Sequence, residues 1–555
     1  MAQNFPWLST YEALGKQWHS LPDISIKTLS CYIRDHSHDF SDRTALVYLG
    51  HRISYRALNE MADRLANYLL AQGFTAGDVM GIHLPNTPQY VVALVAASRI
   101  GMVVTSLSPL MTASEITHVA NDAGVKVIIT LDSLFKTVIS NIVGQISSLQ
   151  AVLVSSASEL LPDGPVANVE SKDLTQLASL THALNAATAA PVFSDISVHD
   201  VHYLQYTGGT TGKPKGAQLS SHNIFTNNLQ ADVFYGYRLG QEVVASAFPM
   251  FHIGGAAVMF NALRMAATFI VVPDPRNIEQ FCSEMRNHPP TVIANVPALF
   301  QMLVNSPLFR DLDFSQLRIA VSGAAPFAEE EIKRLEEVIG KGKFCEVYGM
   351  TETSPIQTLN PAGRFKPGYV GVPVPGTEVR IVDVETGTRE MPLGEPGEII
   401  VSGPQVMRGY FAMPDATEKA LRQFQGKTWM YTGDIGFMDE DGYVKVCDRS
   451  KDMLIVGGYK VFSVEVESKL RELDFIEQCA VVGRPDPARP GNEIVQLYVQ
   501  LRGKPALTEE ELKQRITQFC RENMSPYKVP KEIFFIEAIP LTSVGKIDKK
   551  ALRQA

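Results

Sequence analysis

The chain has 555 residues, with 50 Lys and Arg against 59 Asp and Glu, so its net charge is −9. At roughly 100–200 residues per domain, this length predicts several domains with large buried cores. Hydrophobic residues make up 45% and charged residues 20%, which is typical of a globular protein and excludes a disordered or collagen-like chain. The acidic balance argues against a nucleic-acid-binding protein, because such a protein needs a basic face.

The six cysteines are scattered, and no two of them have the C-x-x-C spacing of a metal or redox site. We interpret them as free thiols in a reducing compartment. The most apolar stretch, 90–105, contains Ser98 and Arg99 and falls short of the roughly 20 apolar residues that span a membrane. The N-terminus does not have the pattern of a signal peptide. We expect a cytoplasmic protein without a membrane span; the sequence leaves peripheral membrane association, and the choice between monomer and homodimer, open.

The first 200 residues alternate between helix and strand patterns. Apolar residues at helical spacing predict a helix that begins after Ser54 and ends at Gly73. Alternation of this kind predicts doubly wound parallel sheets that are covered by helices on both faces. The next predicted elements are a strand at 79–84, a helix at 88–100, a strand at 102–105, a helix that opens at Ser114 and a strand at 125–130.

Residues 154–196 have weak periodicity and are interpreted as loop and surface helix. The α/β alternation resumes at 240–345, with strands predicted at 269–272 and 317–321 and a helix at 329–339. From 368 to 447, Gly and Pro recur between short β runs, which predicts a β-rich subdomain. Its predicted strands are 378–382, 398–401 and 443–447.

The last hundred residues have the pattern of a separate small α+β domain. Thr508 and Glu511 predict a capping box before an amphipathic helix, and strands are expected at 494–501 and 533–536. The predicted organisation is a large N-terminal domain at 1–447, a hinge at 448–452 and a mobile C-terminal domain at 453–555.

The most informative segment, 206–216, has the sequence YTGGTTGKPKG. Its four glycines can turn backbone N–H groups inward, while its threonines and lysines add donors and positive charge, as a phosphate-binding loop requires. It is not a P-loop, because Thr207 and Pro214 stand where that motif needs Gly and Ser or Thr. A flexible surface turn is the other interpretation, and it does not account for this composition.

The segment resembles the signature loop of the adenylate-forming superfamily, which includes acyl-CoA synthetases, aryl-CoA ligases, luciferases and peptide-synthetase adenylation domains. The other motifs of the superfamily follow in order, so the resemblance covers nearly the whole chain. They are FPMFHIGG at 248–255, VSGAAP at 321–326, VYGMTETSP at 347–355, YTGD at 431–434, DRSKD at 448–452 and Gly545-Lys546.

The resemblance implies a two-step reaction with ATP, Mg²⁺ and coenzyme A. A carboxylic acid attacks the α-phosphate of ATP to give an acyl-adenylate and pyrophosphate, and the thiol of coenzyme A then displaces AMP. Catalysis of such a step is mostly positioning and charge neutralisation.

The resemblance also implies which residues carry the chemistry. Lys546, Thr351 and Glu352 are the expected catalytic residues, and Glu352 with Thr207 would ligate Mg²⁺. Tyr348 would stack on adenine, while Asp434 and Arg449 would contact the ribose. The full expected nucleotide site is Thr207, Gly208, Gly209, Thr210, Thr211, Gly212, Lys215, Gly323, Ala324, Tyr348, Gly349, Thr351, Asp434, Arg449 and Lys546.

In the superfamily, the small domain rotates between the two half-reactions. On that pattern Lys451 is the hinge residue, and Gly457 and Gly458 line the channel for coenzyme A. Three positions depart from the pattern: Asp448 replaces a more usual Gly, Glu346 replaces Gln near the adenine, and Ser463 replaces Pro, where we expect it to cap the following helix.

The expected acyl pocket is lined by His252, Gly254, Gly255 and Gly323, with His252 as a wall or gate. Small apolar walls fit an alkyl chain, although helix packing also explains such residues. The closest resemblance is to bacterial medium- and long-chain fatty acyl-CoA ligases, so we expect fatty-acid activation. An aryl-acid CoA ligase and an acyl-AMP ligase that loads a carrier protein are the alternatives.

Overall fold

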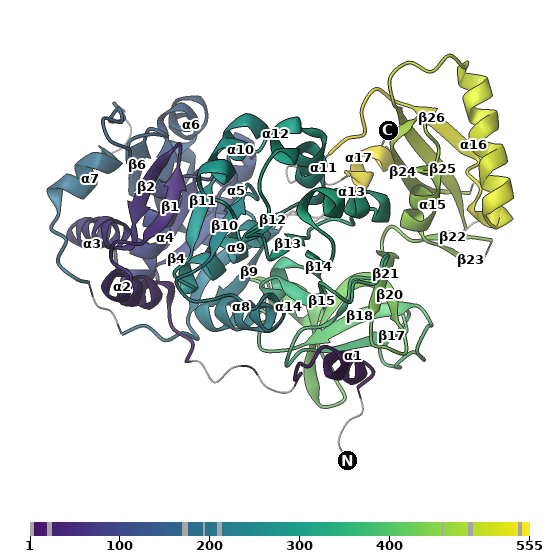
Figure 1. Ribbon diagram of the computed structural model, residues 1–555, viewed down its shortest axis with the longest axis horizontal. Coiled ribbons are helices and arrows are strands. Elements are labelled where there is room, and N and C mark those ends of the chain that lie inside the picture. Colours follow the sequence, from purple (N-terminus) through teal and green to yellow (C-terminus); the bar gives the residue numbers. More distant parts are fainter. Residues whose placement is uncertain are drawn as a thin grey trace.

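The computed structural model describes residues 5–18, 21, 25–168, 176–192, 195–207, 214–457, 459–486, 492–541 and 547–554. Two large sheets and their helices form most of the molecule, a β-rich sheet lies beside them, and the C-terminal residues form a small unit at one end (Figure 1). The predicted α/β architecture with parallel sheets and a small C-terminal domain is confirmed.

The first large sheet has seven strands and is parallel except for the β8–β9 hairpin. The segment 154–196, which we expected to be loop and helix, also supplies the edge strand β7, because its backbone pairs with β6. In sheet order the strands are β7 (Gln176–Ser179), β6 (Ala151–Ser155), β5 (Val125–Leu131), β3 (Val79–His83), β4 (Val103–Ser106), β8 (Val201–Thr207) and β9 (Lys215–Ser220).

The second large sheet has nine strands, with antiparallel strands at its two ends. In sheet order they are β16 (Val372–Pro373), β15 (Ile356–Asn360), β14 (Phe344–Gly349), β13 (Ile319–Ser322), β12 (Val292–Asn295), β10 (Val243–Ser246), β11 (Thr268–Val271), β1 (Thr44–Tyr48) and β2 (His51–Ser54).

Local capping explains where several helices of this large part begin and end. The side chain of Ser54 caps α3, and Gly101 ends α4 in the left-handed conformation. The helix expected to open at Ser114 instead begins at Ala113, because Thr112 and Glu115 form a capping box. All of α4 is buried, within an apolar core that joins residues of both sheets.

The helices of the large part are α1 (Leu8–Ala13), α2 (Leu29–Asp39), α3 (Tyr55–Ala71), α4 (Pro88–Ile100), α5 (Ala113–Ala123), α6 (Asp132–Thr137), α7 (Leu180–Ala186), α8 (Ser221–Tyr235), α9 (Ile253–Arg264), α10 (Ile278–Asn287), α11 (Pro297–Asn305), α12 (Pro307–Arg310), α13 (Glu329–Ile339) and α14 (Pro414–Ala420). Short 3₁₀ turns lie at η1 (Ile139–Asn141), η2 (Val143–Gln145) and η3 (Thr351–Thr353).

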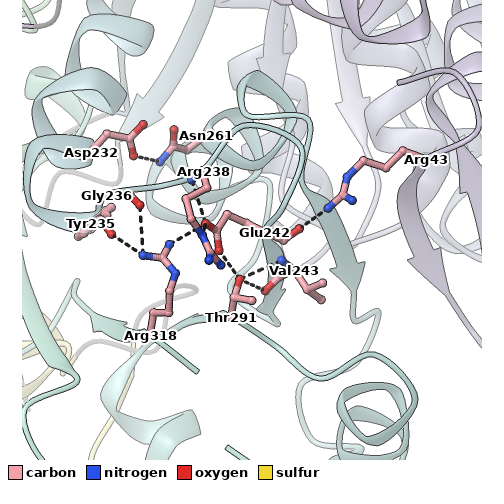
Figure 2. A network of polar contacts seen from close by, with 10 residues as sticks. All are labelled: Arg43, Asp232, Tyr235, Gly236, Arg238, Glu242, Val243, Asn261, Thr291 and Arg318. Atoms are coloured by element: carbon pink, nitrogen blue, oxygen red, sulfur yellow. Dashed lines mark hydrogen bonds and ion pairs between the residues drawn. The ribbon is translucent and has the colours of Figure 1, made fainter. Parts of the chain in front are cut away.

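A polar network around the buried carboxylate of Glu242 lies where β10 begins (Figure 2). The carboxylate of Glu242 accepts hydrogen bonds from Arg238 at 3.0 Å and Arg318 at 2.7 Å, while Thr291 donates to its second oxygen. Burial opposes ionisation of Glu242, but these hydrogen bonds and the charge of Arg318 outweigh it and lower its pKa. Strands β10, β12 and β13 are parallel, so the network lies at the N-terminal ends of these strands. The 321–326 motif begins in the last two residues of β13 and therefore lies at the opposite, C-terminal end.

The β-rich sheet is antiparallel and contains the strands predicted at 378–382, 398–401 and 443–447. Its strands are β17 (Glu378–Val382), β18 (Gly397–Ser402), β19 (Leu421–Phe424), β20 (Lys427–Met438) and β21 (Val444–Arg449). Strand β21 continues through the expected domain boundary at 447 and stays paired with β20 as far as Arg449. The hinge at 448–452 and the domain limits stay predictions.

The small C-terminal unit packs helices against a three-stranded sheet. The capping box at Thr508 and Glu511 is present. Among the described residues, no helix combines the length and apolarity that crossing a bilayer would require. The elements of this unit are β22 (Leu454–Val456), β23 (Tyr459–Val461), α15 (Ser463–Leu470), β24 (Ile476–Pro485), β25 (Glu493–Leu501), α16 (Glu509–Asn523), η4 (Pro526–Lys528), β26 (Glu532–Phe535) and α17 (Lys549–Gln554).

Candidate active site

The glycine-rich loop connects the two strands of the β8–β9 hairpin. Residues 208–213 lie outside the described residues, but both ends of the loop are placed: Thr207 pairs with Lys215 across the hairpin. The roles of Gly208, Gly209, Thr210, Thr211 and Gly212, and those of Gly458 and Lys546, which also lie outside the described residues, stay predictions.

Three expected nucleotide-site residues meet at the junction of two sheets. Tyr348 near the end of β14 donates its hydroxyl hydrogen to Asp434 Oδ2 at 2.6 Å. Asp434 and Arg449 lie opposite each other on β20 and β21, and Arg449 Nε is 3.1 Å from Asp434 Oδ1. Each carboxylate oxygen has two acceptor sites, so Asp434 keeps the capacity to accept the two hydroxyl groups of a diol.

A second cluster surrounds Glu352 in η3. Its Oε1 accepts a hydrogen bond from the Tyr410 hydroxyl at 2.6 Å, and Lys215 Nζ lies 4.9 Å from the centroid of the Tyr410 ring. Burial raises the pKa of Glu352, although the Tyr410 hydrogen bond and the positive charges of Arg449 and Lys215 act in the opposite direction. The positive charge of Arg449 in the first cluster therefore favours the ionised form of Glu352 in the second.

The remaining motif residues of this site follow the ends of β13 and β14. Gly323 and Ala324 come directly after β13, where Ser322 pairs with Glu346, and Gly349 is the last residue of β14. Thr351 begins the turn η3 and adjoins Glu352. Because β13 and β14 are parallel, the 321–326 and 347–355 motifs lie together at the C-terminal ends of these strands. The contacts of the individual residues with a nucleotide stay predictions.

His252 and the glycines after it form the start of α9. His252 is the N-cap, and its Nδ1 accepts a hydrogen bond from the Gly254 N–H at 3.1 Å. A Cβ on Gly254 would lie 2.5 Å from the Phe248 ring, and one on Gly255 would lie 2.1 Å from the carbonyl oxygen of Pro249. Close packing thus requires both glycines, and the acyl-pocket role expected for His252, Gly254, Gly255 and Gly323 stays a prediction.

The DRSKD segment at 448–452 begins with the last two residues of the active-site strand β21 and continues beyond it. Lys451 lies two residues beyond Arg449, and burial together with the charge of Arg449 lowers the pKa of its ammonium. Gly457 lies in the turn between β22 and β23. The hinge role of Lys451 and the coenzyme A role of Gly457 stay predictions.

Two departures from the family pattern have structural explanations. We expected Ser463 to cap α15, but this prediction was wrong, because Phe462 is the N-cap residue. The Ser463 hydroxyl instead accepts a hydrogen bond from Lys549 Nζ at 2.6 Å. Glu346 on β14 is buried, and its carboxylate accepts the Phe327 N–H at 3.2 Å. Burial raises the pKa of Glu346 to about 7.

Sequence reasoning missed Tyr410, which is separated from Glu352 by 58 residues. A lone tyrosine outside the recognised motifs gives no sequence signal, since its contact depends on how the chain returns to the site. In the part of the chain that the structure describes, no three or more His, Cys, Asp and Glu residues are grouped to hold a metal ion.

The sequence matches two family models. The model described as AMP-binding enzyme matches residues 33–411, and that of the AMP-binding enzyme C-terminal domain matches residues 465–546. The chain is 34% identical to a long-chain-fatty-acid–CoA ligase of Bacillus subtilis, over 100% of this chain and 98% of that protein.

Two solved structures illustrate the similarity in fold. ATP-bound MatB from Rhodopseudomonas palustris is 28% identical, with a TM-score of 0.80 over 95% of this chain and 99% of that one. The anthranilate CoA ligase AuaEII in complex with anthranoyl-AMP has a TM-score of 0.83 over 96% of this chain and 98% of that one. At 24% identity, the second likeness shows the fold alone.

Proposed function

The chain belongs to the AMP-binding enzyme family, and from this premise we propose that it activates a medium- or long-chain fatty acid with ATP and transfers the acyl group to coenzyme A. The products would be acyl-CoA, AMP and pyrophosphate. The observation that carries the proposal is the similarity to a long-chain-fatty-acid–CoA ligase along the whole length of both proteins.

The geometry of the site supports the first half-reaction. Asp434 and Arg449 would bind the ribose, since the carboxylate can accept from both hydroxyl groups. Lys215, at the end of the glycine-rich loop, would contribute positive charge near the pyrophosphate that leaves when the acid oxygen attacks the α-phosphorus. Lys546 would neutralise the charge that develops on the attacking carboxylate and the α-phosphate.

The residues present fit a magnesium ion that arrives with the nucleotide. Mg²⁺ prefers oxygen ligands and is usually held by one or two carboxylates together with substrate phosphates, so Glu352 supplies the kind of donor it needs. When bound, the ion would neutralise phosphate charge during adenylation. Thr207, at the start of the loop, is the second expected ligand.

The fatty-acid assignment is favoured over the aryl-acid alternative by the curated relative, because the aryl-acid ligase shares only the fold at 24% identity. Peripheral membrane association, a cytoplasmic location and a monomeric or homodimeric state stay predictions from the sequence.

A substrate panel tests the proposal. Purified protein with ATP, Mg²⁺ and coenzyme A should give kcat/KM values for C8–C16 fatty acids at least tenfold above those for benzoate and coumarate. The assignment fails if an aryl acid is the better substrate. A reaction that stops at acyl-AMP with coenzyme A, but proceeds with an acyl carrier protein, would instead support the carrier-loading alternative.

A further inference from the structure

The segment 405–411 lies between strand β9 of the glycine-rich hairpin and the turn η3 that carries Glu352, and its backbone is hydrogen-bonded to both. Its backbone runs along β9: the Gln218 N–H donates to the Gly409 carbonyl at 3.0 Å, and the Phe411 N–H donates to the Gly216 carbonyl at 2.8 Å. On its other side, the Met407 N–H donates to the Glu352 carbonyl at 2.8 Å. The segment therefore holds η3 and β9 at a fixed separation.

Tyr410 is the residue of this segment whose side chain contacts functional groups on both neighbours. Its hydroxyl donates to Glu352 Oε1 at 2.6 Å, and its ring lies 4.9 Å from Lys215 Nζ. Both Tyr410 and Glu352 are buried. A short hydrogen bond in a buried place fixes the rotation of the carboxylate, while the face of an aromatic ring attracts an ammonium group.

We propose that Tyr410 is a positioning residue for the activation reaction: it orients the Glu352 carboxylate for the metal–nucleotide complex and keeps Lys215 beside the glycine-rich loop. The proposal rests on the proposed ATP-dependent function. Partners that hydrogen-bond to a metal-ligating carboxylate typically change metal affinity by 10- to 100-fold when they are removed.

Two substitutions separate the two contacts. Tyr410→Phe removes the hydroxyl but keeps the ring near Lys215, whereas Tyr410→Leu removes both. Tyr443→Phe is a matched control, because the buried Tyr443 also donates one hydrogen bond, to the Arg364 carbonyl at 2.8 Å, and Tyr443 does not belong to either cluster of the active site.

The direct measurement is binding of Mn²⁺, as a spectroscopic substitute for Mg²⁺, in the presence of α,β-methylene ATP, which cannot transfer its adenylyl group because a P–C bond replaces the P–O bond that breaks in the reaction. We expect Tyr410→Phe to weaken Mn²⁺ binding by about 10- to 100-fold, with binding of the metal-free nucleotide unchanged. Tyr410→Leu should in addition weaken binding of the metal-free nucleotide, because Lys215 loses its support. Tyr443→Phe should change neither.

Activity gives a second readout. In fatty-acid-dependent pyrophosphate exchange, Tyr410→Phe should raise the Mg²⁺ concentration for half-maximal rate and leave the rate at saturating Mg²⁺ within a few-fold of wild type. Unchanged Mn²⁺ affinity in Tyr410→Phe, with a loss of thermal stability like that of Tyr443→Phe, would reduce Tyr410 to a packing role and overturn the proposal. If the wild type exchanges no pyrophosphate with any acid, the proposed function fails, while the Mn²⁺ measurement still decides the role of Tyr410.

Discussion

Glu346 is a single residue whose burial has a consequence for stability. Its folded-state pKa lies at about 7, above the ordinary value of 4.5, because burial disfavours its charged form. The folded state therefore binds this proton more tightly than the unfolded state. The resulting contribution to the free energy of unfolding is fully present below about pH 4.5 and is lost as the pH rises through about 7. A gap of this size corresponds to about 3 kcal/mol at most.

We predict that Glu346→Gln stabilises the protein at pH 8 by up to about 3 kcal/mol and has a much smaller effect at pH 5. The amide oxygen can still accept the Phe327 N–H, so the hydrogen bond at 3.2 Å is retained. Thermal unfolding midpoints at the two pH values measure this difference. Glu440→Gln on the exposed surface is the control; equal shifts for both variants would contradict the prediction.

At the scale of the element, the sequence pattern predicts the ends of a helix correctly where residues next to those ends define them. The helix predicted at 88–100 and the one predicted at 329–339 have those limits in the structure. Strand β7 was missed because it is an edge strand that pairs with β6 and has no pattern of its own. Ser463 was misassigned because a hydroxyl contact with Lys549, 86 residues away, cannot be read from local sequence.

The C-terminal helix α17 is attached to the segment expected to be the hinge. Arg553 donates to the Lys451 carbonyl at 3.3 Å and pairs with Asp452 at 2.5 Å, while Lys549 pairs with Glu467 at 2.7 Å. We predict that Arg553→Gln speeds amide hydrogen exchange at 450–453 by about 3- to 10-fold, since a partly exposed charged hydrogen bond contributes about 1 kcal/mol.

Hydrogen-exchange mass spectrometry of the full chain measures this effect. Lys513→Gln is the matched control, because it breaks a 2.7 Å pair with Glu509 on the exposed face of α16, away from the hinge segment. Exchange at 450–453 that stays at the wild-type rate in Arg553→Gln would show that α17 does not hold this segment.

At the scale of the whole molecule, the site is built from parts that are far apart in the sequence. Lys215 follows the hairpin loop, Tyr348 lies on β14 of the nine-stranded sheet with Glu352 in the turn after that strand, and Asp434 and Arg449 come from the β-rich sheet. Their convergence was predictable only from the ordered motifs, since no local pattern encodes contacts over such separations. Tyr410 lies outside those motifs, so only the folded chain reveals its contact with Glu352.

The small C-terminal unit is expected to supply Lys546 to adenylation and Gly458 to thiolysis, and this leads to a prediction about the two half-reactions. If Lys546 acts only in adenylation, Lys546→Ala should lower fatty-acid-dependent pyrophosphate exchange by about 10²- to 10³-fold, because it removes charge stabilisation at the reacting phosphate. Thiolysis of supplied acyl-AMP by coenzyme A should stay within a few-fold of wild type. Gly458→Leu is the complementary variant and should slow thiolysis while sparing exchange, because its side chain would obstruct the expected thiol channel. Equal loss of both half-reactions in Lys546→Ala would contradict the rotation of the small domain about 448–452, since one fixed arrangement would then serve both steps.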